Sequence, residues 1–172
     1  YYKTIQIGSQ CWMKENLFYF PLAGNCRCYE LSIQNCYVYG LLYDWDAIMA
    51  GSASSNSIPS GVQGICPQDW HVPSDAEWMQ LEAYLGMSPT ELSYTGGRGT
   101  DEGGKLKETG TTHWNAPNTG ATNSSGFTAL PGGYHQIGGG SYALHANANF
   151  WTSTEQLTNN AFSRGLARDS EQ

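Results

Sequence analysis

The chain has 172 residues, which is enough for one domain with a sizeable buried core. Charged residues make up only 13%, roughly half of the ~25% usual in soluble domains. Aromatic residues make up another 13%, and 21 residues are glycine, so the composition argues against a helical bundle and against a disordered chain. The formal net charge of −7, without any basic run, argues against nucleic acid as a partner, and no apolar stretch approaches the ~18 residues of a membrane span.

The first 20 residues predict two strands. Residues 1–7 form a strand-like run, Gly8 supplies a turn, and an aromatic-rich run continues from Trp12 to Phe20. No initiator methionine and no signal peptide are visible, so we expect a processed or partial chain whose targeting segment has been lost.

The cysteines indicate a disulfide framework. All five lie in the first 66 residues: Cys11, Cys26, Cys28, Cys36 and Cys66. The spacing of Cys26 and Cys28 is one residue too tight for a zinc site, and no H-x₃₋₅-H follows. We therefore predict disulfides formed in an oxidising compartment, and Cys28 and Cys36 could close a short ring. Because five is odd, one thiol is expected to be free or to pair outside this chain.

Two helices are predicted next. Residues 39–49 predict a short helix that ends at Gly51, with three residues on its inner face: Leu42, Trp45 and Met49. The better-specified one lies within residues 64–86, where Ser74 and Glu77 have the spacing of a capping box. Its apolar residues recur at i, i+3 and i+7, and a glycine at position 86 supplies the stop: Trp78, Leu81 and Leu85.

The second half of the chain predicts ordered loops and short strands. Residues 109–128 are rich in Thr, Asn and Gly, and Trp114 and Phe127 are the expected anchors of this loop. Beyond it, four short strands joined by glycine turns are predicted: residues 127–130, 131–134, 150–154 and 161–168.

Candidate metal and catalytic groups are weakly supported. Asp101 and Glu102 in the glycine-rich loop 95–104 could contribute oxygen ligands to calcium, but the regular spacing of an EF-hand is missing. No phosphate-binding loop and no G-x-S-x-G elbow occur. The four histidines lie in four different segments, so we interpret them as buried or loop-anchoring residues: His71, His113, His135 and His145. The sequence therefore predicts no metal site, no cofactor and no catalytic residue.

Five blocks of the sequence resemble the Fibrobacter succinogenes major paralogous domain family and together cover nearly the whole chain: residues 7–17, 39–49, 64–78, 110–134 and 150–155. The resemblance implies a secreted bacterial module of surface proteins. It also implies an α+β fold of the C-type-lectin-like and formylglycine-generating-enzyme-like kind: one compact domain with two short helices, small antiparallel sheets and long ordered loops.

The chain departs from the family pattern at its end. Family members usually close with a strand that carries a cysteine, and the resemblance implies that this cysteine pairs with the one at Cys66. The sequence stops at Gln172 without such a strand. We therefore expect a single domain over residues 1–172 that lacks its usual closing strand, with Cys66 unpaired unless Cys11 or Cys26 takes that role.

Two functions are expected from these features, and a third is not. The first is a non-catalytic structural module, outside the cell or on the surface of a bacterium, that assembles with itself into a fibre or adhesin by strand exchange or by a disulfide. The alternative is a glycan-binding module, with Trp114, Tyr134 and His135 as candidate ligand-binding residues. An oxidase like the formylglycine-generating enzymes is not expected, because they need a reactive cysteine pair late in the domain and no cysteine follows Cys66.

Overall fold

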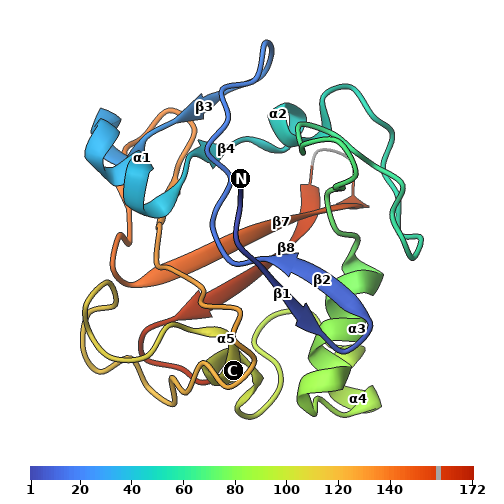
Figure 1. Ribbon diagram of the computed structural model, residues 1–172, viewed down its shortest axis with the longest axis vertical. Coiled ribbons are helices and arrows are strands. Elements are labelled where there is room, and N and C mark those ends of the chain that lie inside the picture. The colour runs from blue at the N-terminus through green and yellow to red at the C-terminus, as the bar shows by residue number, and fades with distance from the viewer. Residues whose placement is uncertain (158–159) are drawn as a thin grey trace.

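The computed structural model describes residues 1–157 and 160–172, and it alternates short helices with antiparallel hairpins (Figure 1). Within these residues there are four two-stranded antiparallel sheets: β1 (Thr4–Ile7) with β2 (Gln10–Met13), β3 (Cys26–Arg27) with β4 (Leu42–Tyr43), β5 (Tyr134–His135) with β6 (Ser141–Tyr142), and β7 (Asn147–Leu157) with β8 (Asn160–Ala167). The helices are η1 (Tyr29–Leu31), α1 (Ile33–Tyr39), α2 (Trp45–Met49), α3 (Asp75–Leu85), α4 (Pro89–Leu92) and α5 (Glu102–Leu106). The predicted α+β class with small antiparallel sheets is confirmed.

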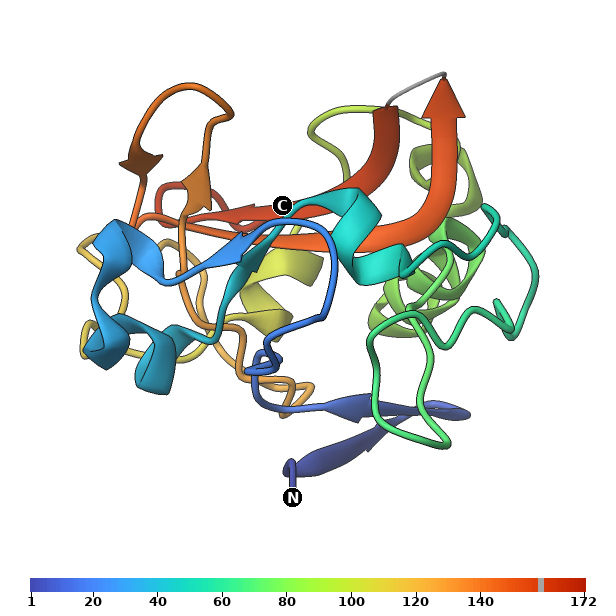
Figure 2. The same cartoon turned by 90° about the horizontal axis from the view of Figure 1, so that it is seen from above.

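The long β7–β8 hairpin crosses the middle of the molecule, and the other elements surround it (Figures 1 and 2). Helix α3 lies toward one end and α1 toward the other. The β1–β2 hairpin lies on the opposite side of the molecule from the β5–β6 hairpin, as Figure 2 shows. No helix in the described residues combines the length and apolar character needed to cross a membrane.

Aromatic side chains hold these elements together. The rings of Trp12 and Trp78 lie 4.8 Å apart, and both contact Phe127 at 5.9 Å between centroids. Trp114 and Phe127, the predicted loop anchors, are 1% and 6% exposed and belong to the same core cluster. Since each buried aromatic ring removes a large apolar area from water, a chain poor in regular structure can still be well ordered.

The predictions for β1–β2 and α3 are confirmed. Gly8 takes the left-handed conformation (φ 59°) in the two-residue turn between β1 and β2. At α3, the Ser74 hydroxyl accepts from the Glu77 N–H (3.1 Å), and a Glu77 carboxylate oxygen accepts from the Ser74 N–H (2.9 Å). Trp78 and Leu81 are buried as expected.

The helix predicted over residues 39–49 is shorter than expected. Leu42 and Tyr43 form β4 and pair with β3, so their backbone groups serve a sheet instead of a helix. Asp44 then starts α2, because its carboxylate accepts from the Ala47 N–H (2.8 Å). The helix ends at Met49, and Ala50 caps it in a left-handed conformation (φ 48°), one residue before the predicted glycine stop.

Two other details of the prediction were wrong, the number of helices and the strands before Tyr134. The two predicted helices correspond to α2 and α3, but the described residues also contain α1, α4 and α5. Residues 127–133 form no strand; Ala129 makes one isolated parallel bridge to Lys107, and β5 begins only at Tyr134. The predicted strands over residues 150–154 and 161–168 are confirmed as parts of β7 and β8.

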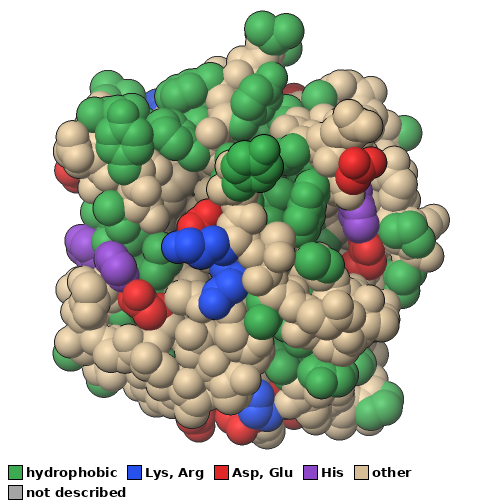
Figure 3. Space-filling model, viewed as in Figure 1, with side chains coloured by type: hydrophobic (Ala, Val, Ile, Leu, Met, Phe, Trp, Pro, Cys, Tyr) green, Lys and Arg blue, Asp and Glu red, His purple; other side chains and the backbone are tan. Residues whose placement is uncertain are grey.

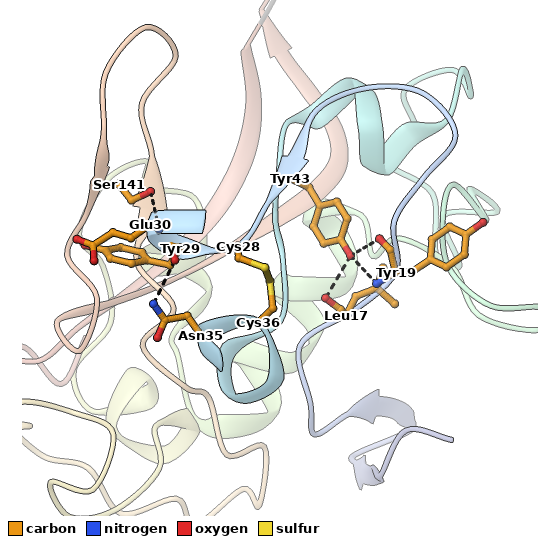
Figure 4. Close-up of a disulfide and its surroundings, with 9 residues drawn as sticks. All are labelled: Leu17, Tyr19, Cys28, Tyr29, Glu30, Asn35, Cys36, Tyr43 and Ser141. Atoms are coloured by element: carbon orange, nitrogen blue, oxygen red, sulfur yellow. Dashed lines mark hydrogen bonds between the residues drawn. A yellow bond between two sulfur atoms is a disulfide. The ribbon is translucent and has the colours of Figure 1, made fainter. Parts of the chain in front are cut away.

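The Cys28–Cys36 disulfide is confirmed, and it joins the start of η1 to α1 (Figure 4). Both cysteines are buried, and the Asn35 amide beside them donates to the Tyr29 carbonyl (3.1 Å). The wider disulfide prediction was wrong: three cysteines are unbonded, of which one is exposed and two are partly buried: Cys11, Cys26 and Cys66.

Replacing both Cys28 and Cys36 with serine is expected to lower the free energy of unfolding by about 2–3 kcal/mol, because the unfolded chain loses the constraint of a short closed ring. Urea denaturation measures the loss. Reducing the wild-type protein with dithiothreitol should give a similar loss, whereas the double variant should not respond to the reductant. A wild-type protein indifferent to reduction would contradict this prediction.

Candidate functional site

The described residues line a groove of about 1340 Å³. Strand β2, the β3–β4 pair, loops 65–73 and 127–139, and β7 contribute to its walls. Its lining is mostly apolar and includes four aromatic residues that belong to, or pack against, the core: Trp12, Trp78, Phe127 and Phe150. In Figure 3, hydrophobic side chains run from the centre of the view up to the loop that projects at its top.

Strand β2 lines this groove with an open edge. The Lys14 N–H donates to the carbonyl of Lys3 opposite it (2.9 Å), and bonded pairs alternate along an antiparallel ladder. By this alternation the backbone N–H and C=O of Trp12 form hydrogen bonds with β1, whereas those of Cys11 and Met13 point away from β1. Within residues 1–157 and 160–172, no hydrogen bond reaches these four groups. The groove therefore exposes a short row of unpaired backbone donors and acceptors.

Cys66 forms part of the groove wall. It packs against a buried cluster that includes Ile48, Val62 and Ile65. This burial raises the pKa of the Cys66 thiol to about 11, because the thiolate is poorly solvated there. The exposed Cys11 also lines the groove.

We expect iodoacetamide to modify Cys11 well before Cys66 at pH 8. A thiol with a pKa of about 11 is ionised in only about one molecule in a thousand at that pH, and the thiolate is the reactive form. Raising the pH to 10 should speed the modification of Cys66 by about two orders of magnitude. Mass spectrometry of the tryptic peptides gives both rates, with the urea-unfolded chain as the control in which the two thiols react alike. Equal rates in the folded protein at pH 8 would contradict the burial of Cys66.

The histidines anchor loops. At the rim of the groove, His71 Nε2 lies 2.7 Å from Glu77 Oε1, while Glu77 Oε2 accepts from the backbone of Ser60 and Ser74 (3.2 and 2.9 Å). This carboxylate is occupied in joining a loop to the start of α3.

A second histidine cluster joins the loop 109–128 to α1. His113 Nδ1 lies 2.9 Å from Glu108, and His145 Nδ1 lies 2.7 Å from the carbonyl of His113. The Tyr39 hydroxyl is 3.1 Å from the same His145 nitrogen, and burial raises the pKa of Tyr39. Among the residues that the structure describes, no three His, Cys, Asp or Glu side chains come together as metal ligands.

The structure separates the predicted ligand-binding residues. Trp114 is 1% exposed and its Nε1 donates to the Ala129 carbonyl (3.0 Å), so its ring cannot stack on a ligand; its prediction as a binding residue was wrong. Tyr134 and His135 lie on β5 at one end of the groove. Tyr134 is 46% exposed, and its ring is 5.8 Å from that of Tyr142 on the paired strand.

The candidate calcium ligands face different partners. Asp101 Oδ1 lies 2.6 Å from the Lys105 ammonium, and Glu102 Oε2 accepts from the Thr100 N–H (2.7 Å). Each carboxylate therefore neutralises or caps a neighbouring group in its own loop.

Sequence reasoning missed the groove and the open edge of β2. The only local signal was the apolar run Phe18–Leu22 in a loop that otherwise carries polar residues, which is unusual for an exposed segment. Nothing in the periodicity of residues 10–13 shows that one of their two edges stays unpaired.

One comparison with known proteins identifies a relationship. The model of the Fibrobacter succinogenes major domain family matches residues 5–171. Neither the curated proteins nor the solved structures contain a match to this chain.

Proposed function

This chain belongs to the Fibrobacter succinogenes major domain family, and from that membership together with the groove we propose that it is a non-catalytic extracellular module that assembles with copies of itself. The assembly is a surface fibre or an adhesin of a bacterium. The observation that carries this proposal is the apolar groove of about 1340 Å³ beside an open strand edge.

The groove suits the addition of an extended segment from a neighbour. A strand that enters it gains backbone hydrogen bonds from the open edge and buries apolar side chains against the aromatic lining. When donor and acceptor lie on different parts of one molecule, the contact is heterologous, and repetition of it gives an open-ended chain of subunits.

Two further observations support this function. The Cys28–Cys36 disulfide fits an oxidising, extracellular compartment. Exposed Cys11 can form a disulfide with a neighbour directly, whereas Cys66, with its raised pKa, would do so only after a partner thiol has entered the groove. Family membership also favours the C-type-lectin-like arrangement of loops around a small set of strands.

Glycan binding is the second candidate. It is favoured by the Tyr134–Tyr142 pair, since both rings are nearly half exposed and stand beside His135. Aromatic faces of this kind can stack on sugar rings. A glycan array with the wild-type protein and with a Tyr134→Ala, Tyr142→Ala variant tests this alternative; binding lost in the variant would support it, and no binder above background would exclude it.

Self-assembly is tested on the full chain by sedimentation velocity over a range of concentrations and by electron microscopy. We expect a concentration-dependent series of oligomers, and a ladder on a non-reducing gel after mild oxidation. A strict monomer at every concentration would overturn the proposed function.

A further inference from the structure

We propose that the open edge of β2 receives the projecting loop Phe18–Leu22 of a second copy of the chain, paired in parallel. This inference rests on the proposed function and names the two surfaces that meet. The acceptor strand and the donor loop are different segments, and Figures 1 and 2 place them apart on the molecule. Each copy can therefore donate its loop to one neighbour and accept the loop of another.

We choose β2 as the acceptor because backbone groups on two other strands that line the groove, β4 and β7, are already in use. The Tyr43 carbonyl on β4 accepts from Trp151 Nε1 (2.9 Å), and the Thr152 carbonyl on β7 accepts from Trp45 Nε1 (2.8 Å). On β2, by contrast, the outward N–H and C=O of Cys11 and Met13 have no partner within the described part of the chain.

The donor is a segment whose apolar side chains are exposed at alternate positions. Phe20 is 56% exposed and Leu22 is fully exposed, and the Phe18 ring supports Phe20 at 5.8 Å. The loop projects at the top of the view in Figure 1. No hydrogen bond in the described residues uses the backbone of Phe20 or Leu22. An exposed apolar tip on the same chain as an apolar groove is the reason to choose a second copy as the occupant.

The backbone pattern of the two segments matches. In a parallel pair, the residue directly opposite Met13 makes no hydrogen bond toward β2. The residues before and after it bond instead to the N–H and the C=O of Met13. If Pro21 takes that place, Met13 N–H donates to the Phe20 carbonyl and Leu22 N–H donates to the Met13 carbonyl. Proline is then at the position where no N–H is needed.

The same register places the side chains correctly. Residues directly opposite one another in a sheet share a face, and successive residues alternate. Phe20 and Leu22 therefore lie on the face of Trp12, toward the aromatic lining of the groove. An antiparallel pair would place them on the face of Cys11, which is exposed. Burial of the two apolar side chains thus selects the parallel orientation.

The test uses one variant of each surface. Leu22→Asp places a charge at the tip of the donor segment, where the side chain is fully exposed and the change does not affect folding. Met13→Pro removes from the acceptor strand an N–H donor that β1 does not use. Leu22→Asp alone is expected to associate at least about tenfold more weakly than wild type in sedimentation, because burial of one leucine accounts for that much affinity. Met13→Pro alone is also expected to associate more weakly, because the acceptor strand loses a backbone hydrogen bond. Mixed together, the two variants should form a dimer and stop there, since one keeps the acceptor and the other keeps the donor.

Matched controls are Tyr94→Asp, at an exposed aromatic residue outside the groove, and Gln6→Pro, at an outward position on the outer edge of β1. Both should assemble like wild type. If wild type assembles and Leu22→Asp assembles equally well, the inference is wrong although the proposed function stands. If wild type never assembles, the proposed function itself fails. Thermal unfolding checks that Met13→Pro is folded; if it is not, Leu22→Asp and competition by a peptide of residues 17–24 decide the matter.

Discussion

Replacing Lys107 with methionine is expected to lower the free energy of unfolding by about 3–5 kcal/mol, because up to three partly buried carbonyls lose their donor while the aliphatic stem is kept. The side chain is fully buried, and its ammonium donates to the carbonyls of Thr119, Ala167 and Ser170 at 2.8, 2.9 and 2.6 Å. These carbonyls belong to the loop 109–128, to the end of β8 and to the C-terminal segment. One side chain therefore joins three parts of the chain.

Urea denaturation measures the loss for Lys107→Met. The control is Lys3→Met, whose side chain is 80% exposed and which should change stability by less than about 0.5 kcal/mol. A loss below about 1 kcal/mol for Lys107→Met would show that the three carbonyls find other donors.

The same variant should also change the pH dependence of stability. Burial lowers the pKa of Lys107 below its value in the unfolded chain, so just below pH 10.5 the unfolded state binds more protons at this site. Stability contributed by this site therefore rises with pH across that window. The difference between wild-type and Lys107→Met stability should grow between pH 8 and pH 10, provided that the fold persists.

Replacing Glu82 with glutamine is expected to cost about 3–5 kcal/mol, because the nearly buried guanidinium of Arg98 loses its counter-charge and that of Arg164 loses one of its two carboxylate partners. Glu82 Oε2 lies 2.6 Å from Arg98 Nη2, and Glu82 Oε1 lies 2.6 Å from Arg164 Nε. Arg164 Nη1 also lies 2.7 Å from Asp75 Oδ1. The side chains of these four residues are 7–12% exposed, so water cannot replace the lost charge.

Asp101→Asn is the matched control for Glu82→Gln. It breaks the pair between Asp101, which precedes α5, and Lys105 on that helix. The carboxylate is 55% exposed, and a pair exposed in this way contributes at most about 1 kcal/mol. Chemical denaturation of both variants under the same salt conditions gives the comparison. Equal losses would mean that burial does not strengthen the Glu82 network.

Both predictions concern contacts that tie β8 to the rest of the fold. Lys107 holds the carbonyl at the end of β8, and Arg164 of β8 reaches Glu82 on α3. Since β8 pairs with no strand except β7 within the described part of the chain, these contacts keep the central hairpin in place while the neighbouring groove stays open. A subunit that accepts a strand needs such a rigid frame, because ordering the acceptor on binding would reduce affinity.

Local chemistry made several elements predictable. Gly8 permits the tight turn between β1 and β2, Ser74 and Glu77 cap α3 reciprocally, and the spacing of Cys28 and Cys36 suits a short ring. Each of these features depends on residues within about ten positions of one another, so its cause is visible in the order of the residues.

Where local preference competed with a distant partner, the predictions went wrong. Residues 42–43 have a helical apolar pattern but pair with β3, and Trp114 has the ring of a sugar-binding residue but fills the core. In both cases hydrogen bonds and burial contributed by other parts of the chain outweighed propensity, which amounts to only a fraction of a kcal/mol per residue.

The amino-acid sequence by itself determined the α+β class, the family, the capped helix and the ring closed by Cys28 and Cys36. Only the tertiary structure decided that β2 keeps one edge unpaired, that an apolar groove lies beside it, and that Lys107 is buried among carbonyls. The physical reason is that an unpaired edge or a buried charge is defined by which distant groups come near it. Periodicity and spacing report only on neighbours along the chain.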